Sequence, residues 1–510
     1  MTAIPDSTPV IIGVGQYAER PDDADYTALS PMDLGGKTLG AAIADCDASG
    51  DVAGAIDTIA AIRQFEISTP GAVAPFGKSN NVPRSYGKRV GADPERAILE
   101  IVGGQGPQKL VGELAADIAE GRSSVAAVVG SEAISTVLTL SKSGEKPDWS
   151  EEVDGSLEDR GLGMRGLLDK TLIAHGLVTP ISLYALFENA RRAERGMGLD
   201  AYRQEIGELF APFSQVAARN PYAAAPVART AEELATVTER NRIVAEPYTR
   251  MTVARDQVNQ AAAILIASAA RARELGVPEE QWVHIHAVTD AKELSVLERP
   301  DMAVSPASIA SVRDALEIAG IDMDAIGYFD LYSCFAIAVT NVSEAFGIAP
   351  DDPRGLTLTG GLPFFGGAGN NYSAHAVAEA VQKVRADENA YALVGANGGF
   401  MSKYATGIYS RLPADWIEGE RFRKLPEQTE KLLVQDEYAG EAVVDTYTIV
   451  PGKQGTVATV VARTQADARI AANAASDDAE TLAVLQEGAP FGRTITVRAE
   501  GGRNLFTFAD

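Results

Sequence analysis

Short apolar runs alternate with helical segments along the first 130 residues. Residues 9–15 form a β-branched run that ends in glycine, and apolar residues recur with helical spacing over 32–43. The alternation continues with apolar strand-like runs at 53–62, 98–102 and 125–129 and with a helical segment at 110–118. This order is typical of strands that are connected by crossover helices. It predicts a mostly parallel sheet covered by helices.

The pattern changes after Glu132. Residues 138–159 are polar and interrupted by glycine and proline, and two helical stretches follow. We interpret 139–250 as an excursion from the sheet rather than as an independent domain. Its arginines, Arg191, Arg192 and Arg195, could meet phosphate or could pair with local glutamates on an exposed helix face.

The rhythm of strands and helices returns at 260–269, a run that we predict to be helical. His284 and His286 then alternate within a strand-like segment at 282–288, which places both rings on one face. A metal site could use such a pair, but no third ligand is near in the sequence. A partly exposed strand is therefore the preferred interpretation.

The stretch 326–373 carries much of the candidate chemistry. It begins with a strand and Tyr332-Ser333-Cys334-Phe335, and it ends in a glycine-rich run at 358–373. Glycine removes side chains where a backbone turns tightly or approaches a ligand closely. Such a loop either lines a pocket or lets two layers pack. A second glycine turn, Gly103-Gly104-Gln105-Gly106, would point backbone N–H groups above a helix N-terminus, but its spacing is not a dinucleotide fingerprint.

Residues 413–510 have a different character. Apolar and polar residues alternate as strands at 442–450, 455–463, 493–499 and 503–508, and 466–485 is predicted to be a helical or mobile connector. This pattern indicates a small β-rich C-terminal domain. Because it has no basic aromatic platform, we do not expect it to bind oligonucleotides; a packing or shielding role is favoured.

Composition narrows the classes of function further. A chain of 510 residues is too long for one compact core, and its formal net charge of −25 argues against broad contact with nucleic acid or anionic membrane. The two cysteines, Cys46 and Cys334, cannot form a disulfide framework or a cysteine zinc site, so we expect no metal and a reduced, cytoplasmic setting. No signal peptide and no apolar run of membrane-spanning length is visible.

Four motifs in a particular order make the chain recognisable. These are Asn220-Pro221-Tyr222, Asp330 to Phe335, Thr359-Gly360-Gly361-Leu362 with its trailing glycines, and Asn397-Gly398-Gly399. Their order over residues 8–412 resembles the thiolase superfamily, most of all the thiolases associated with sterol carrier protein. With the appended β-rich domain, the chain is also similar to the thiolase-like protein type 1 group.

The resemblance implies a fold and a ligand class. The expected fold is α/β, with two similar halves in a five-layered α/β/α/β/α core. The halves would cover 1–285, including the excursion, and 286–412, followed by the β-rich domain at 413–510. Coenzyme A thioesters become the expected substrates, with no tightly bound cofactor and a role in lipid metabolism.

The departures from the thiolase pattern are as informative. Gly103 occupies the position of the nucleophilic cysteine, and Gly366-Gly367-Ala368 matches the family's Gly-His-Pro triplet without its histidine. Tyr332 replaces the histidine of the sterol-carrier-type motif, whereas its cysteine persists as Cys334. Loss of the nucleophile removes the usual covalent acyl-enzyme, so ordinary thiolysis is not expected.

The remaining groups could still polarise a carbonyl and move a proton. Tyr332 and Cys334 are the first candidates for acid–base work, although a free phenol titrates near pH ~10 and a thiol near ~8.5. A thiolate of Cys334 would need stabilisation by nearby amides or by the following helix. Both residues could instead be inert parts of the core. Three backbone amides could hold an oxyanion, and five further polar residues complete the candidate site. The amides are those of Gly103, Gly104 and Gly367; the polar residues are Asn370 and His375 for catalysis and Tyr222, Asn371 and Tyr372 for substrate binding.

Three functions remain open. The first is an acyltransferase or retro-Claisen enzyme that acts on acyl-CoA without a cysteine nucleophile. The second is a retro-aldolase that uses Tyr332, since some thiolase-like aldolases carry a tyrosine there and work with a small partner protein. The third is a protein that binds acyl-CoA or another metabolite without chemistry. We expect a monomer or homodimer.

Overall fold

One long sheet path organises the first 412 residues. The computed structural model describes residues 4–417, 419–452, 455–475 and 478–509. The path runs β10-β11-β12-β9-β1-β8-β4-β2-β3-β5, and β13 pairs with β9. Its strands are β1 (Pro9–Ala18), β2 (Thr58–Ala61), β3 (Arg96–Leu99), β4 (Val125–Ala133), β5 (Glu158–Asp159), β8 (Asn259–Ser268), β9 (Val283–Lys292), β10 (Ile326–Asp330), β11 (Tyr391–Gly398), β12 (Lys403–Ser410) and β13 (Phe422–Lys424).

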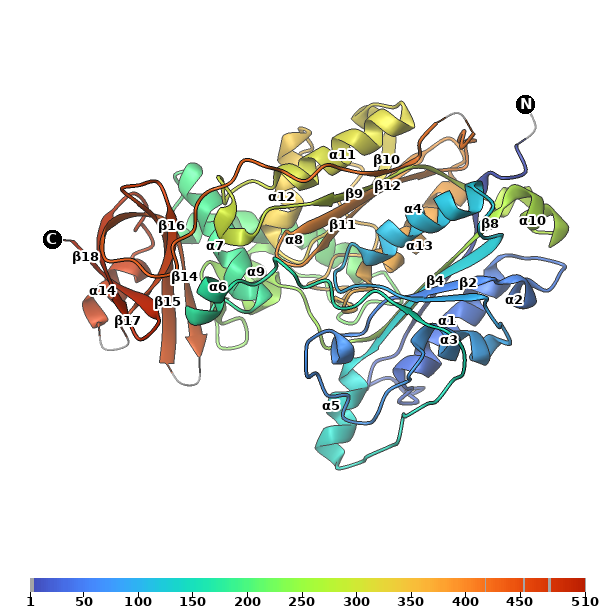
Figure 1. Ribbon diagram of the computed structural model, residues 1–510, viewed down its shortest axis with the longest axis horizontal. Coiled ribbons are helices and arrows are strands. Elements are labelled where there is room, and N and C mark those ends of the chain that lie inside the picture. The colour runs from blue at the N-terminus through green and yellow to red at the C-terminus, as the bar shows by residue number, and fades with distance from the viewer. Residues whose placement is uncertain (1–3, 418, 453–454, 476–477, 510) are drawn as a thin grey trace.

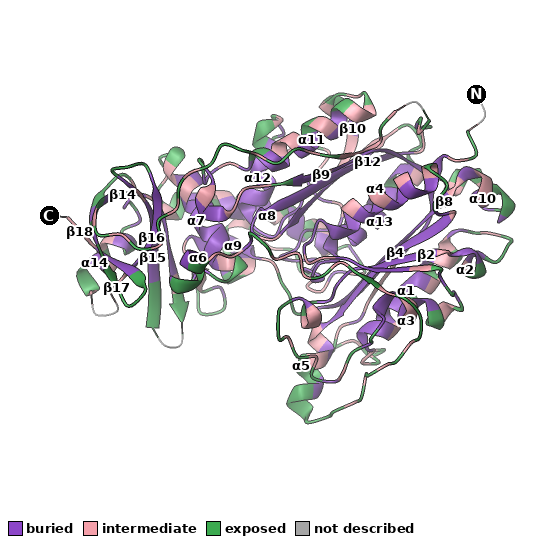
Figure 2. Ribbon diagram, in the orientation of Figure 1, coloured by how far each residue is buried: buried purple, intermediate pink, exposed green. Residues whose placement is uncertain are grey.

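The path folds into two sheets that enclose two helices, α4 (Gly106–Ala119) and α13 (Tyr372–Ala386) (Figure 1). The sheets join where β1 pairs with β9 through Val10 and His284. Helices α1 (Pro31–Asp45) and α3 (Val82–Val90) cover one outer face, and α11 (Pro306–Ala319) and α12 (Ala336–Ala345) cover the other. This arrangement is the expected five-layered α/β/α/β/α core. Figure 2 shows that its strands are almost entirely buried.

The sheet is mixed rather than mostly parallel, which corrects the prediction. β2 pairs in parallel with β3 and β4, but β8 runs antiparallel to both β1 and β4. Residues 260–269, predicted to be helical, lie in β8. This strand is buried on both faces, so its apolar run has no two-residue period that would distinguish a strand from a buried helix.

Smaller differences have similar causes. His284 and His286 are buried in β9, not on a partly exposed strand, and burial lowers the pKa of each to about 4. The run 53–62, predicted as one strand, divides into α2 (Val52–Ala55), capped by the Asp51 side chain, and β2. No group of three or more metal-ligating side chains occurs among the described residues.

The part of the excursion that contains α6 to α9 lies between the core and the C-terminal domain, whereas α5 projects from the bottom of the core (Figure 1). Arg191 and Arg195 both pair with Glu205 and Glu344, and Arg192 donates to backbone carbonyls, so the glutamate-pairing alternative holds for the first and third. Its elements are α5 (Ile134–Ser143), α6 (Lys170–Ala174), α7 (Pro180–Glu194), α8 (Leu199–Ala217), α9 (Ala231–Ala235), β6 (Ile243–Ala245) and β7 (Tyr248–Thr249).

The C-terminal domain is a closed barrel in the order β14-β15-β16-β18-β17. The connector predicted at 466–485 contains a strand, β16, because its apolar residues close the barrel between β15 and β18. The turn at 451–455 includes residues outside the described part. The elements are β14 (Gly440–Gly452), β15 (Gly455–Thr464), β16 (Arg469–Ala474), α14 (Ala479–Gln486), β17 (Thr494–Glu500) and β18 (Arg503–Phe508).

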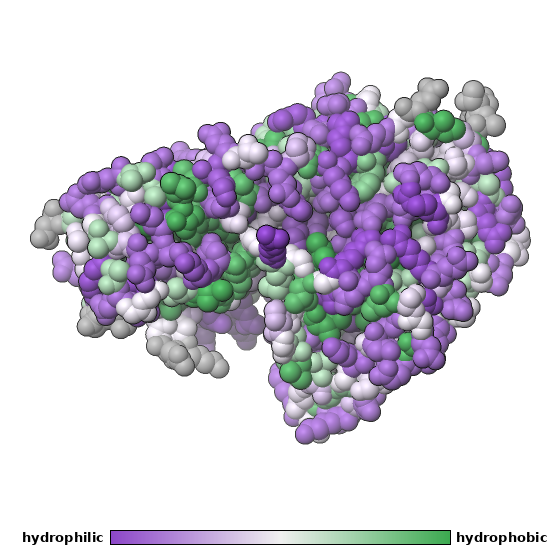
Figure 3. All heavy atoms as spheres, viewed as in Figure 1, coloured by the Kyte–Doolittle hydropathy of each residue, from purple (hydrophilic) through white to green (hydrophobic). Residues whose placement is uncertain are grey.

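The barrel is fastened to α7 of the excursion. Thr446 Oγ1 donates to the Leu186 carbonyl at 2.6 Å, and Asn189 Nδ2 donates to the Tyr447 carbonyl at 3.0 Å. His175 adds a link, since its Nε2 accepts the Asn504 amide at 2.9 Å. The surface in Figure 3 is mostly hydrophilic, with apolar side chains gathered in small patches beside the notch between the lobes.

Candidate functional site

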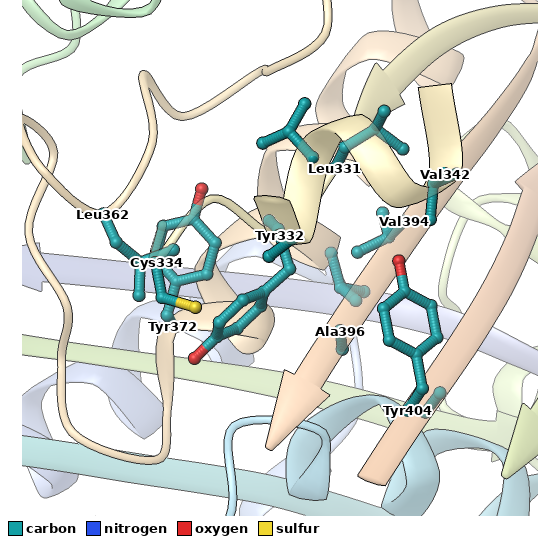
Figure 4. Close-up of a cluster of buried hydrophobic side chains, with 14 of the residues drawn as sticks. Leu331, Tyr332, Cys334, Val342, Leu362, Tyr372, Val394, Ala396 and Tyr404 are labelled. Atoms are coloured by element: carbon teal, nitrogen blue, oxygen red, sulfur yellow. The ribbon is translucent and has the colours of Figure 1, made fainter. Parts of the chain in front are cut away.

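The candidate site forms where β3, β10 and β11 end above α4 and α13. Tyr332 and Cys334 follow β10, and Figure 4 shows the Tyr332 ring beside the Cys334 sulfur, with Tyr372, Ala396 and Tyr404 around them. Tyr332 keeps 5% of its surface exposed and Cys334 keeps 8%. The site is therefore closely packed.

Asp330, the last residue of β10, organises one wall of the site. Its buried carboxylate accepts hydrogen bonds from the amides of Leu358 and Thr359 at 2.8 and 3.1 Å and from the Tyr372 hydroxyl at 3.1 Å. Because a side chain takes these amides, residues 357–360 form a turn rather than a strand of the sheet. Tyr372 thereby has a structural partner.

A second wall is the turn that carries Gly103. Its amide donates to Asn370 Oδ1 at 2.9 Å, and Asn370 Nδ2 donates to the Arg63 carbonyl at 2.6 Å. All polar atoms of the Asn370 side chain are thus engaged in holding loops together. These contacts suit a positioning role for Asn370, whereas the sequence suggested a catalytic one.

The three candidate oxyanion donors differ in availability. The Gly103 amide is bound by Asn370, and the Gly367 amide donates to the Arg255 carbonyl at 2.7 Å. The Gly104 amide donates to no described residue, and a Cβ at Gly104 would overlap the Tyr332 hydroxyl. Gly104 is therefore the amide that remains free next to Tyr332.

The two acid–base candidates are both held in their protonated forms. Burial, reinforced by the neighbouring Cys334, raises the pKa of Tyr332 well above its ordinary value. Burial raises the pKa of the Cys334 thiol to about 12, although hydrogen bonding to Tyr184 and nearby amides acts in the opposite direction. Catalysis by Cys334 was expected to need a stabilised thiolate, whereas this environment favours the neutral thiol. At neutral pH both groups are hydrogen-bond donors.

His375 lies in a separate network. Its Nδ1 is 2.8 Å from Gln16 Oε1, and Glu379 accepts hydrogen bonds from Gln16 and Asn220, each at 3.0 Å. Burial lowers the His375 pKa to about 3, so the ring is neutral. Among the described residues, His375 is linked to Tyr332 only indirectly, through ring contacts with Phe365 and Tyr372.

The two remaining substrate candidates also lie apart from Tyr332. Asn371 donates to the Gly130 carbonyl at 2.8 Å and anchors the start of α13 to β4. Tyr222 is partly exposed, and its carbonyl accepts a hydrogen bond from Gln260. The predicted site thus separates into a compact centre around Tyr332 and a set of supporting residues.

Sequence reasoning missed three residues of this centre. Asn397 Nδ2 donates to the Tyr184 hydroxyl at 2.8 Å and lies 4.0 Å from Cys334 Sγ. Gln105 lies against Gly103 and Gly398. Gln105 and Asn397 stand in motifs that the sequence analysis quoted, so a polar residue beside glycines was the available signal. Tyr184, within the excursion, had none.

Comparisons with known proteins agree with this architecture. Residues 425–502 match the family model for the thiolase-like protein type 1 additional C-terminal domain. No curated protein matches the chain. No helix among the described residues is long and apolar enough to cross a membrane.

Solved structures extend the comparison to the whole chain. A dimeric peroxisomal thiolase of Saccharomyces cerevisiae is 14% identical with a TM-score of 0.56, covering 80% of this chain and 98% of its own. The Ltp2-ChsH2(DUF35) aldolase is 17% identical with a TM-score of 0.58, covering 79% of this chain and 98% of its own. A monomeric SCP2-thiolase-like protein type 1 from Mycobacterium smegmatis is 40% identical with a TM-score of 0.84, covering 99% of this chain and 100% of its own. The chain therefore belongs to the SCP2-thiolase-like protein type 1 family.

Proposed function

We propose that this protein binds a coenzyme A thioester with its acyl end at Tyr332 and acts on a carbon–carbon bond beside the thioester carbonyl, without a covalent acyl-enzyme. The observation that carries the ligand class is a cluster of three arginines at the edge of the site: Arg242, Arg250 and Arg255. Phosphate groups are the part of coenzyme A that such a cluster would recognise.

Arg250 lies near both Arg242 and Arg255. The Arg250 amide donates to the Arg242 carbonyl at 2.9 Å, so these residues are neighbours across the β6–β7 hairpin. Arg255 is exposed to solvent, and partial desolvation together with the charge of Arg250 lowers its pKa, whereas the charge of Asp256 raises it. None of the three guanidinium groups forms an ion pair or hydrogen bond with a described residue. Like charges placed side by side are unfavourable unless an anion joins them.

Their backbone connects the cluster to the centre of the site. The Ala254 amide donates to the Cys334 carbonyl at 3.0 Å, and the Arg255 amide donates to the Leu362 carbonyl at 3.1 Å. In a chain with a net charge of −25, a local group of unpaired cations is where an anionic ligand would gather. A ligand with phosphates at one end and a carbonyl at the other fits this arrangement.

The proposed chemistry uses neutral donors. The Tyr332 phenol and the Gly104 amide would stabilise negative charge on a thioester oxygen, as in an enolate. In retro-Claisen cleavage, the thiolate of an incoming coenzyme A would attack C3 of a 3-oxoacyl-CoA, and the C2–C3 bond would break. The enolate of the departing acetyl-CoA would then take a proton at C2.

A retro-aldolase is the second candidate, and an unpaired acceptor at Gln105 favours it. In that reaction the 3-hydroxyl loses its proton, the C2–C3 bond breaks to give a carbonyl compound, and the resulting enolate takes up a proton. The fold neighbour that is described as an aldolase is a complex with a second protein. Under this candidate the chain would work with a small partner, so activity of the purified chain alone distinguishes the two.

Binding without chemistry is the third candidate. It is favoured by the protonated state of Tyr332 and Cys334 and the neutral state of His375, since none of these is poised as a strong base. Unchanged thioesters after binding would select it.

The test is a calorimetric titration with coenzyme A, dephospho-coenzyme A, acetyl-CoA and a 3-oxoacyl-CoA, followed by mass analysis. We expect affinity that weakens with salt and weakens about tenfold or more in Arg250→Gln/Arg255→Gln. Arg313→Gln is the matched control, because this exposed arginine on α11 also lacks a described partner. Absence of binding to any of the four compounds would overturn the proposal.

A further inference from the structure

Gln105 has an unusual position for a polar residue. Its side chain is only 1% exposed, yet its carboxamide forms no hydrogen bond with a described residue, and Oε1 is fully enclosed. A buried polar atom without a partner costs about 1–3 kcal/mol. Buried carboxamides are normally paired, so an unpaired one next to a candidate site calls for a ligand.

Two glycines pack against this carboxamide. A Cβ at Gly103 would overlap Gln105 Oε1, and a Cβ at Gly398 would overlap the same atom. The resemblance to thiolases matches Gly103 to the position of their nucleophile. The chain therefore has a carboxamide in the space that a cysteine side chain would take.

The carboxamide lies close to the other free groups of the site. Gly104, between Gly103 and Gln105, is in contact with the Tyr332 hydroxyl. Asn397, which precedes Gly398, has an enclosed Oδ1 that also lacks a described partner. Tyr332, Cys334 and Phe400 keep 5%, 8% and 8% of their surface exposed.

The hydrogen-bonding inventory of these groups specifies a ligand. The carboxamide offers one acceptor and an NH2 donor in either of its two orientations, and the Tyr332 hydroxyl and Gly104 amide add donors. A thioester carbonyl satisfies donors only. The acceptor at Gln105 needs an O–H or N–H on the ligand near that carbonyl.

We propose that Gln105 is a specificity-determining residue that selects a 3-hydroxyacyl thioester over a 3-oxoacyl thioester. Its Oε1 accepts a hydrogen bond from the 3-hydroxyl, while Tyr332 and the Gly104 amide donate to the thioester oxygen. A 3-oxoacyl group would present a second acceptor and leave Oε1 unpaired. This inference rests on the proposed function for the thioester group alone, and it favours the retro-aldolase candidate over retro-Claisen cleavage of a 3-oxoacyl-CoA.

The test uses short ligands that lack phosphate, so that it is independent of the arginine cluster. The 3-hydroxybutyryl and 3-oxobutyryl thioesters of N-acetylcysteamine are titrated against the wild type, Gln105→Leu and Gln105→Glu. We expect the wild type to bind the hydroxy compound about tenfold or more tightly than the oxo compound. Leucine should abolish that ratio, whereas glutamate, which keeps an acceptor, should retain much of it.

Two outcomes would overturn the inference. One is equal affinity of the wild type for the two short thioesters, or no binding of either. The other is a preference that Gln105→Leu leaves unchanged while its circular dichroism and unfolding midpoint match the wild type. Coenzyme A binding that depends on Arg250 and Arg255 would survive either outcome, so failure here and failure of the proposed function are distinguishable.

Discussion

The Gly103 amide donates its hydrogen bond to Asn370 Oδ1, so the turn that ends β3 is held by the loop that begins α13. These residues are 267 positions apart in the sequence and belong to different halves of the core. The same asparagine donates to the Arg63 carbonyl and to Ser68 Oγ. One side chain thus fixes three loops around the candidate site.

Replacing Asn370 should therefore reduce stability. We expect Asn370→Ala to lower the free energy of unfolding by about 1–3 kcal/mol, because buried donors and acceptors lose their partner. Urea unfolding followed by circular dichroism measures the effect. Asn389→Ala, at an exposed asparagine without a described side-chain hydrogen bond, is the control and should change little. Equal midpoints for the two variants would contradict the positioning role.

Two tyrosines that face each other should respond differently to loss of their hydroxyl groups. The Tyr372 hydroxyl bonds to Asp330 and Thr359, whereas the Tyr332 hydroxyl bonds to no described residue. Tyr372→Phe should lower the free energy of unfolding by about 1–3 kcal/mol. Tyr332→Phe should leave stability within about 0.5 kcal/mol but weaken thioester binding. Thermal unfolding and a ligand titration on both variants test the contrast, and a large stability loss in Tyr332→Phe would refute it.

A side chain at position 103 should not be tolerated beside Gln105. Gly103 has φ +143°, a conformation that favours glycine, and a Cβ there would overlap Gln105 Oε1. We expect Gly103→Ala to cost about 1–3 kcal/mol in backbone strain, with a further cost for the overlap. Adding Gln105→Ala to the Gly103→Ala variant should restore only the part of the free energy of unfolding that is lost through the overlap. A double-mutant cycle by urea unfolding measures that coupling, and strictly additive effects would exclude the steric explanation.

The carboxyl group of Glu132 should make stability depend on pH. Burial, with a smaller contribution from Glu66, raises its pKa to about 8. The folded state therefore keeps a proton that the unfolded state releases above its ordinary pKa of 4.5. The stabilisation is present below pH 4.5 and is lost as pH rises toward 8.

Glu132→Gln isolates this contribution. The amide keeps an oxygen that can accept the Phe65 amide at 2.9 Å, but it does not ionise. We expect the stability of the wild type relative to the variant to fall between pH 5 and pH 8. Urea unfolding at several pH values measures the difference, and parallel curves for the two proteins would show that Glu132 does not titrate in this range.

The sequence predicted helices and strands best where the spacing of apolar residues has the period of the element that forms. The amphipathic segments 32–43 and 110–118 lie within α1 and α4, and the alternating strands of the C-terminal domain became β14, β15, β17 and β18. In α1, one face is buried and the opposite face is exposed, so its period is visible, whereas α4 is enclosed by the two sheets and was recognised by its apolar spacing alone. Strand β8 was predicted as a helix because both of its faces are buried.

The candidate site was predictable only in part, because the spacing of residues in a short segment does not reveal which distant residues its side chains contact. Tyr332 and Cys334 were found through their motif, but the burial that keeps both protonated depends on distant elements. Asn370 was predicted to be catalytic, and its hydrogen bonds to Arg63 and Ser68 join residues that are distant in the sequence. Gln105 was overlooked because its meaning depends on the two glycines, Gly103 and Gly398, that surround it in space.

The hydrogen bonds between α7 and the barrel have a mechanical consequence. Thr446 and Tyr447 of β14 bond to the backbone and side chains of α7, and Ile449 accepts the amide of Glu246 beside the arginine hairpin. The β6–β7 hairpin, which carries Arg242 and precedes Arg255, is thus tied to the barrel. A displacement of the hairpin that opens a path to Tyr332 must break the bond between Glu246 and Ile449 or move the whole barrel with it. The C-terminal domain therefore restrains the movement of the hairpin.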